Sequence, residues 1–179
     1  LFMISNTLEM RPYVKATDEA EMALSDYLEL LKSANIDFDQ ELAFYDPVKP
    51  MSTALMLQEW MDEKPERDII EKYATTPGSL YTKITNADWL LYSSIELAKL
   101  IGVNVAKLHE IRVRVKYGVK KELLDLIRLE QVGRVRARLM YNNGIKKVAD
   151  LRKEGSAEKV EMLFGKEIAR RIMEQVSAL

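Results

Sequence analysis

Apolar residues recur three or four positions apart along almost the whole chain, which is the period of a helix that buries one face. The clearest example is the long helix expected between Pro77 and Gly102, whose apolar stripe includes Ile84. Alternation of apolar and polar residues is confined to short pieces, and we expect extended segments only at residues 1–5 and 11–15. The pattern therefore predicts an all-α fold.

Capping residues and prolines place the ends of the other helices. Thr17 is a candidate N-cap of a helix that runs to about Asn35, because its hydroxyl can accept a hydrogen bond from a free N–H group of the first turn. Gly118 and Gly144 stand where a left-handed residue commonly ends a helix. The remaining helices are expected at residues 52–63, 65–76, 105–117, 120–131, 134–142, 147–153, 157–163 and 166–177.

Two short segments near the end of the chain are weakly similar to each other. Residues 132–138 (VGRVRAR) and 164–170 (FGKEIAR) both place a glycine and then a basic residue at the expected start of a helix. A helix-hairpin-helix motif has this pattern, because glycine allows a tight turn and the N–H groups of the new helix can bind a phosphate. The second copy contains fewer basic residues and could be structural only.

Charge is distributed unevenly along the chain, whose formal net charge is −1. Residues 1–80 contain 7 Lys and Arg against 16 Asp and Glu, a net charge of −9, whereas residues 112–153 contain 13 against 4, a net charge of +9. A concentrated basic block favours a polyanion such as a nucleic acid as partner. The alternative is an ordinary solvated helix surface.

The basic residues around the first of these glycines are the candidate phosphate contacts. Arg134 and Arg138 are four residues apart and share a helical face, while Arg136 lies nearly opposite and Lys146 follows the next expected turn. Together with the N–H groups that follow Gly133, these side chains would bind a nucleic-acid backbone without reading its sequence. The alternative is a solvent face whose arginines form salt bridges to the acidic N-terminal half.

Trp89 is a single large aromatic residue in a polar stripe of the helix that follows Pro77, a stripe that also contains Thr82. A tryptophan on a polar face can stack on an unpaired base of any identity, and Lys83 lies nearby on the same helix. The alternative is that Trp89 packs against a neighbouring helix or domain, since large aromatic side chains are mostly buried.

Several classes of site are excluded or disfavoured by what the sequence lacks. It has no cysteine, which excludes disulfides and thiolate metal sites, and its single histidine, His109, has no partners at metal-ligand spacing. The common nucleotide-binding, zinc-protease and nucleophile-elbow motifs are absent, so the chain alone is not expected to be an enzyme. No membrane span is expected. Trp60, with Leu57 and Met61, has the spacing of a buried stripe.

Three runs of sequence together resemble a known family. They are WMDEKPERDIIEKY from Trp60, PGSLYTKITNADWLLYS from Pro77, and RVRVKYGVKKELLDLIRLEQVGRVRARLMYNNGI from Arg112. These runs closely resemble archaeal Ski2-like superfamily-2 DNA repair helicases, the Hel308 family. The opening FMISNTLEMRPYV also resembles the segment that leaves the winged-helix domain of that family, so the similarity covers nearly the whole chain.

The resemblance implies a domain organisation. Residues 1–125 would form the helical ratchet (Sec63-like) domain, with residues 1–15 as the lead-in from a winged helix, and residues 126–179 would form a helix-hairpin-helix domain. The chain begins with Leu1 instead of an initiator methionine, and we expect a C-terminal fragment. The two RecA-like motor domains of the family, with their sites for ATP and Mg, would lie outside it, and no cofactor is expected in the fragment itself.

The resemblance also implies roles for individual residues. In the family a tryptophan of the ratchet helix stacks on the translocating single strand, and this role carries over to Trp89. The family often has an arginine seven residues earlier, where this chain has Thr82 followed by Lys83. The arginines of GRVRAR, which begins at Gly133, match a C-terminal motif that holds the emerging strand and restrains the motor.

The expected function is therefore that of the non-catalytic DNA-binding part of an ATP-dependent 3′-to-5′ DNA helicase, acting in replication-fork repair in the cytoplasm. Its expected partners are single-stranded or forked DNA and, within one protein, the RecA-like and winged-helix domains. Two alternatives stay open. One is a helical protein-interaction scaffold of an RNA-helicase relative, and the other is a helix-hairpin-helix adaptor that binds duplex DNA.

Overall fold

The computed structural model describes residues 1–34 and 46–178, which belong to two compact units, Leu1–Lys116 (unit 1) and Tyr117–Leu179 (unit 2). Over the described ranges the chain is helical and contains no β-strand, so the predicted all-α fold is confirmed.

Unit 1 is a set of helices whose ends follow the capping rules. Thr17 accepts a hydrogen bond from the Ala20 N–H group, 3.3 Å away, which confirms it as an N-cap, and Thr76 does the same for Ser79 at 3.2 Å. The elements are α1 (Phe2–Ser5), the 3₁₀-helix η1 (Leu8–Met10), α2 (Asp18–Ser33), α3 (Val48–Met61), α4 (Glu66–Lys72), α5 (Pro77–Leu100) and α6 (Ala106–Tyr117).

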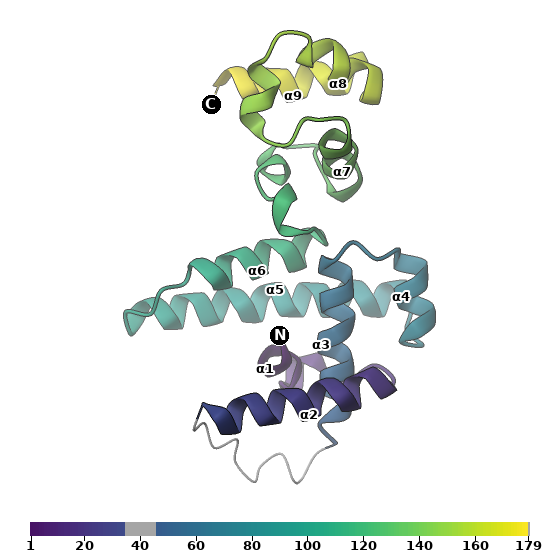
Figure 1. The fold of residues 1–179 in the computed structure, drawn as a ribbon, viewed down its shortest axis with the longest axis vertical. Helices are drawn as coiled ribbons and strands as arrows, with labels where there is room; N and C mark the ends of the chain where they lie inside the picture. Colours follow the sequence, from purple (N-terminus) through teal and green to yellow (C-terminus); the bar gives the residue numbers. More distant parts are fainter. Residues whose placement is uncertain (35–45, 179) are drawn as a thin grey trace. The chain divides into compact units, whose positions relative to one another are not determined.

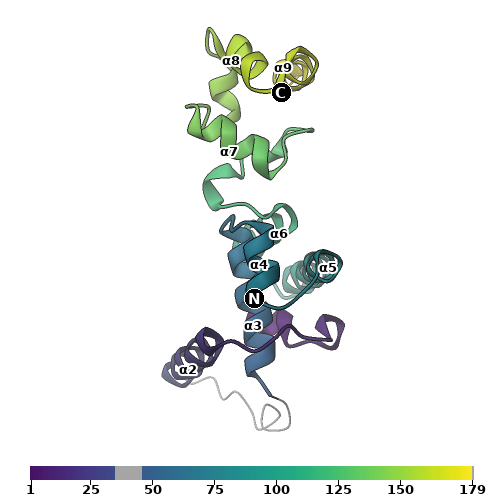
Figure 2. The ribbon, with the colours of Figure 1, turned by 90° about the vertical axis from the view of Figure 1, so that its right-hand side faces the viewer.

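Helix α3 is central to the packing of unit 1. It contacts α1, α2 and α4, and α2 crosses it at a steep angle (Figure 1 and Figure 2). Trp60 on α3 is only 6% exposed, and its indole N–H donates a hydrogen bond to the Val115 carbonyl of α6 at 2.8 Å. The predicted core position of Trp60 is thereby confirmed. The main core consists of Met10, Val14, Met56, Leu57, Trp60, Met61, Ile69, Tyr73, Leu80, Ile84, Ala87, Leu91 and Val115.

Unit 2 consists of shorter helices joined by tight turns. Gly118 and Gly144 have φ values of 63° and 86°, as expected for residues that end helices in the left-handed conformation. Helices α8 and α9 pack against each other, and the 3₁₀-helix η5 contacts both. The elements are η3 (Lys121–Leu123), η4 (Leu126–Arg128), α7 (Arg134–Asn142), η5 (Val148–Arg152), α8 (Ser156–Phe164) and α9 (Lys166–Ala178).

Three local predictions were wrong. Residues 2–5 form the helical turn α1 rather than an extended segment, because Phe2 is buried against the core. Residues 120–131 form two 3₁₀ turns instead of one helix; side chains three residues apart share one face of a 3₁₀-helix, and Leu123, Leu126 and Leu129 are all buried. Residues 148–152 likewise form a 3₁₀-helix.

The division between the units lies between Lys116 and Tyr117, earlier than the boundary predicted at residue 125. Leu123 explains the difference, because it is fully buried and its 3₁₀-helix packs against α7 of unit 2. Across residues 1–34 and 46–178, no helix is long and apolar enough to span a membrane, and no cluster of three or more acidic or histidine side chains has the arrangement of a metal site.

Candidate nucleic-acid interface

The outer face of α5 exposes two aromatic side chains one turn apart. Trp89 is 56% exposed and Tyr92 is 45% exposed, although both belong to the helix that buries Ile84, Ala87 and Leu91 on its other side. Thr82 also lies on the outer face, where its hydroxyl donates a hydrogen bond to the Gly78 carbonyl of the same helix at 2.9 Å. The core of unit 1 therefore does not use the Trp89 indole.

An arginine of α6 fixes this face of α5. The Arg112 Nε atom donates a hydrogen bond to the Asp88 carboxylate at 2.7 Å, and its guanidinium carbon lies 4.8 Å from the centre of the Tyr92 ring. The pair and the cation–π contact together orient Tyr92, which stays partly exposed. The sequence analysis missed Tyr92 and Arg112; the four-residue spacing of Asp88 and Tyr92 on one helical face was the available signal.

Lys83 lies on the buried side of α5, whereas a residue that contacts nucleic acid was expected on the exposed side. Its side chain is 2% exposed and forms no ion pair or hydrogen bond with the residues that the structure describes. Burial lowers the pKa of this lysine below its ordinary value of 10.5, because removal from water disfavours the charged form. Lys83 is therefore not part of the exposed surface around Trp89.

We expect Lys83→Met to raise the free energy of unfolding of unit 1 by about 1 kcal/mol at neutral pH, because burying an unpaired cation is unfavourable. The pKa is lowered in the folded state, so the penalty is full at low pH and is lost as the pH rises from the folded-state pKa to the ordinary value of 10.5. Urea unfolding at neutral and alkaline pH, followed by tryptophan fluorescence, measures both effects. Weaker DNA binding by the variant would instead indicate that Lys83 reaches the strand.

Helix α7 of unit 2 begins directly after Gly133, and no side chain caps its first N–H groups. The helix start is thus open to an anion, as the motif predicted. Gly133 itself has an extended backbone (φ −85°, ψ −177°), and a Cβ added there would meet nothing within 4 Å. The left-handed residue of the turn is Gln131, with φ 68°. Gly165 in the second copy does require a positive φ, 82°.

Basic side chains lie along α7 and beside its last turn, and several already bind protein groups. The Arg136 guanidinium donates a hydrogen bond to the Gln131 carbonyl. Arg138 pairs with Glu122 at 2.8 Å and lies 5.2 Å from the centre of the Tyr141 ring, where the Lys146 ammonium also lies, at 5.6 Å. The structure thus brings Arg138 and Lys146 together over one aromatic ring.

The loop that contains Lys146 is fixed by one carboxylate. Asp150 accepts hydrogen bonds from the N–H groups of Lys146 and Lys147, at 3.0 and 2.9 Å, and pairs with Lys153 at 2.6 Å. The Lys153 bond and then the two backbone bonds lower the pKa of Asp150 to about 2. The carboxylate therefore stays charged at every pH near neutrality and keeps both lysines on the exposed loop.

Two known families match the chain in succession. The family described as archaeal helicase, domain 4, matches residues 1–118, and the family described as a SAM-like helix-hairpin-helix tandem matches residues 123–177. The two matched ranges meet near the place where the structure divides the chain. The tandem agrees with the weak internal repeat that the sequence contains.

Among curated proteins, the chain is similar to the ATP-dependent DNA helicase Hel308 of several organisms. It is 34% identical to the protein from Methanocaldococcus jannaschii over 98% of this chain, and 34% identical to those from Methanococcus vannielii and Pyrococcus abyssi over 97%. It spans 14%, 22% and 24% of the length of these relatives, respectively, and the matched part is their C-terminal region.

Proposed function

Because the chain belongs to the archaeal helicase domain 4 family and continues into a helix-hairpin-helix tandem, we propose that it contacts the moving DNA strand of a helicase without catalysing a reaction itself. The observation that carries this proposal is the exposure of Trp89 on a helix whose core face is complete without it. A tryptophan exposed in this way offers a single-stranded base a flat apolar surface.

In unit 1 the strand would follow the outer face of α5. One base stacks on Trp89, and Tyr92, held by Arg112, offers a second ring one turn further along the helix. Stacking contributes about 1–3 kcal/mol per base and does not depend on base identity. Such contacts are strong enough to hold a strand between steps of a motor and weak enough to release it.

In unit 2 the phosphate backbone would bind at the start of α7. The open N–H groups after Gly133 attract an anion, and Arg134 supplies positive charge at this end of the helix, while Lys146 adds charge beside the last turn of α7, over the Tyr141 ring. Arg136 and Arg138 contribute to the local field, while their bonds to Gln131 and Glu122 also hold the hairpin in shape. Contacts of this kind bind without sequence preference.

The whole protein, as its relatives' names suggest, would be an ATP-dependent DNA helicase. In this proposal ATP and Mg bind in motor domains outside the 179 residues of this chain, and the strand moves in the 3′-to-5′ direction past α5. The chain would convert opening and closing of the motor into one-way movement. Replication-fork repair in the cytoplasm is the proposed setting.

A second candidate function, a protein-interaction scaffold, is favoured by a different observation. Leu97, Leu100 and Ile101 at the end of α5 are exposed apolar residues, and such groups often mark contact surfaces. In that case α5 would bind a protein through its C-terminal end, and Trp89 would belong to the edge of the same surface.

Titration of the chain with fluorescently labelled oligo-dT, a matched duplex and a forked duplex tests the proposed function. We expect saturable binding of the single strand at low salt that weakens as salt is added, because counterions are released from the phosphates. The fork should bind at least as well as either simple form, since it offers a single strand to unit 1 and phosphates to unit 2. No binding of any form at low salt would contradict the proposal and favour the scaffold.

A further inference from the structure

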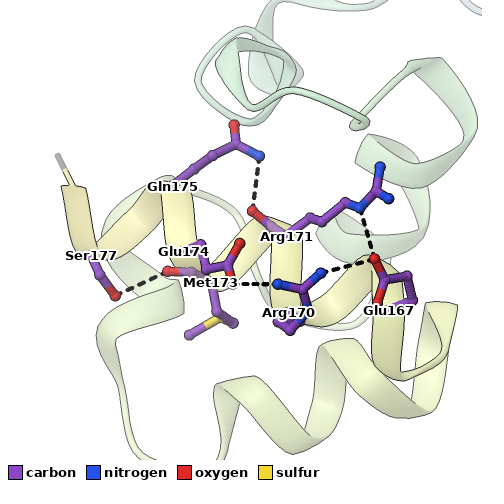
Figure 3. Close-up of polar contacts among 7 residues, drawn as sticks. All are labelled: Glu167, Arg170, Arg171, Met173, Glu174, Gln175 and Ser177. Atoms are coloured by element: carbon purple, nitrogen blue, oxygen red, sulfur yellow. Dashed lines mark hydrogen bonds and ion pairs between the residues drawn. The ribbon is translucent and has the colours of Figure 1, made fainter.

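The turn that precedes α7 is held from outside by a single side chain of α9. Gln175 accepts a hydrogen bond from the Glu130 N–H group at 2.7 Å and donates one to the Glu130 carbonyl at 3.3 Å. Its amide nitrogen also donates to the Arg171 carbonyl within α9 at 3.0 Å, a bond that Figure 3 shows. Every polar group of the Gln175 amide is therefore used, and its orientation is fixed, because a rotated amide would place a donor against the Glu130 N–H group.

The turn that Gln175 binds is a strained one. The Val132 N–H group donates to the Leu129 carbonyl at 3.2 Å, which closes a four-residue turn with Glu130 and Gln131 at its centre. Gln131 has φ 68°, a conformation that suits glycine and is unfavourable for other residues. Such a conformation persists only where surrounding contacts over-determine it. Gln175 binds both backbone groups of Glu130, and Arg136 binds the Gln131 carbonyl.

The bonded turn lies immediately before the open helix start. Gly133 follows Glu130 by three residues, so a change in the turn redirects the first N–H groups of α7. In the second hairpin, formed by α8 and α9, Arg170 and Arg171 of α9 both pair with Glu167. Figure 3 shows these pairs within α9. Helix α9 is therefore hydrogen-bonded to the turn before α7, whereas its two paired arginines contribute little net positive charge for binding DNA.

We propose that Gln175 is a positioning residue, through which the second hairpin holds the turn of the first so that the start of α7 binds a DNA phosphate. This inference rests on the proposed function for its ligand, while the tether itself is a property of unit 2. The second copy of the repeat, which contains few basic residues, would thus act by positioning the first copy.

Gln175→Met in the full chain tests the proposal, because methionine keeps the length of the side chain and removes all of its hydrogen bonds. Hydrogen exchange of the Glu130 amide should become at least about tenfold faster, since this N–H group loses its acceptor. Affinity for a duplex should fall by about fivefold to tenfold. Quenching of tryptophan fluorescence by oligo-dT should not change, because both tryptophans lie in unit 1.

Two further variants separate positioning from general damage. Ser177→Ala removes a hydroxyl of the same helix that bonds only the Met173 carbonyl, at 3.0 Å, and should leave exchange and affinity unchanged (Figure 3). Gln175→Glu keeps the acceptor for the Glu130 N–H group but loses both donated bonds and adds a negative charge, so duplex affinity should not recover. Exchange of the Glu130 amide should nevertheless stay slower than in Gln175→Met, which is expected from a specific hydrogen bond to the turn and not from loss of packing.

The outcomes distinguish the inference from the function on which it rests. Unchanged exchange at Glu130 in Gln175→Met, or unchanged duplex affinity beside a wild type that binds, would overturn the positioning role alone. If the wild-type chain binds neither duplex nor fork at low salt, the proposed function of unit 2 fails, and the DNA part of this inference fails with it.

Discussion

Replacing Trp89 with alanine should weaken binding of single-stranded oligo-dT by about tenfold or more, since stacking of one base contributes about 1–3 kcal/mol. The wild-type chain should show quenching of tryptophan fluorescence as the strand is added, and the variant should show almost none. The chain contains two tryptophans, and Trp60, which is buried, remains in the variant as an internal reference. Fluorescence and anisotropy titrations measure the two effects on the same samples.

Stability should hardly change in Trp89→Ala, because the indole is 56% exposed. Leu97→Ala is the matched control, since Leu97 is an exposed apolar residue of the same helix and belongs to the alternative protein-contact surface of Leu97, Leu100 and Ile101. We expect it to leave oligo-dT binding within about twofold of the wild type. If instead Leu97→Ala and Trp89→Ala weaken binding equally, a broad apolar contact rather than base stacking would explain the affinity.

Tyr92 extends the same prediction by one step. Tyr92→Ala should cause a smaller loss than Trp89→Ala, because part of the ring already faces Arg112 and is less exposed. Tyr92→Phe keeps the ring and the cation–π contact, so it should bind as the wild type does. If the loss of oligo-dT affinity is largest for Trp89→Ala, smaller for Tyr92→Ala and absent for Tyr92→Phe, the result would support two consecutive stacking positions on α5.

Helical periodicity was sufficient to predict the outer face of α5 but not the fate of every residue on it. Trp89 was separated from the apolar stripe correctly, because its position does not match the spacing of Ile84 and Leu91. Lys83 was misplaced, although it follows Leu80 by three residues and precedes Ala87 by four, which is the spacing of the buried stripe. A charged side chain is usually exposed, but Lys83 occupies a position in the buried stripe of the helix, and its side chain is buried there.

Contacts between residues far apart in sequence could not be predicted. The bond from the Val148 N–H group to the Asp125 carboxylate and the bond from the Glu130 N–H group to Gln175 each join segments that are far apart in the sequence. Neither pair has a spacing that local rules recognise, since each bond forms only when tertiary packing brings two segments together. The glycine at position 133 was identified correctly as part of a helix start, but the strained residue of the turn is Gln131.

The largest effect on stability is expected at the other tryptophan. Trp60→Ala should lower the free energy of unfolding of unit 1 by about 3–5 kcal/mol, because a large buried ring leaves a cavity that the neighbouring helices fill only in part. The ring lies among Leu57, Met61 and Val115, and its edge meets Tyr81 with the ring centres 5.9 Å apart. Urea unfolding followed by far-ultraviolet circular dichroism and by the remaining Trp89 measures the loss.

Trp60→Phe tests how much the hydrogen bond of the Trp60 indole contributes to stability, separately from the volume of the ring. Phenylalanine keeps most of the apolar contact but leaves the Val115 carbonyl without the donor that lies 2.8 Å away, so a loss of about 1–3 kcal/mol is expected. Trp89→Phe, the same change at an exposed site, should stay within about 0.5 kcal/mol of the wild type. Equal losses at the two sites would contradict the assignment of one tryptophan to the core and the other to the strand, because only burial makes the indole N–H and the ring volume necessary for folding.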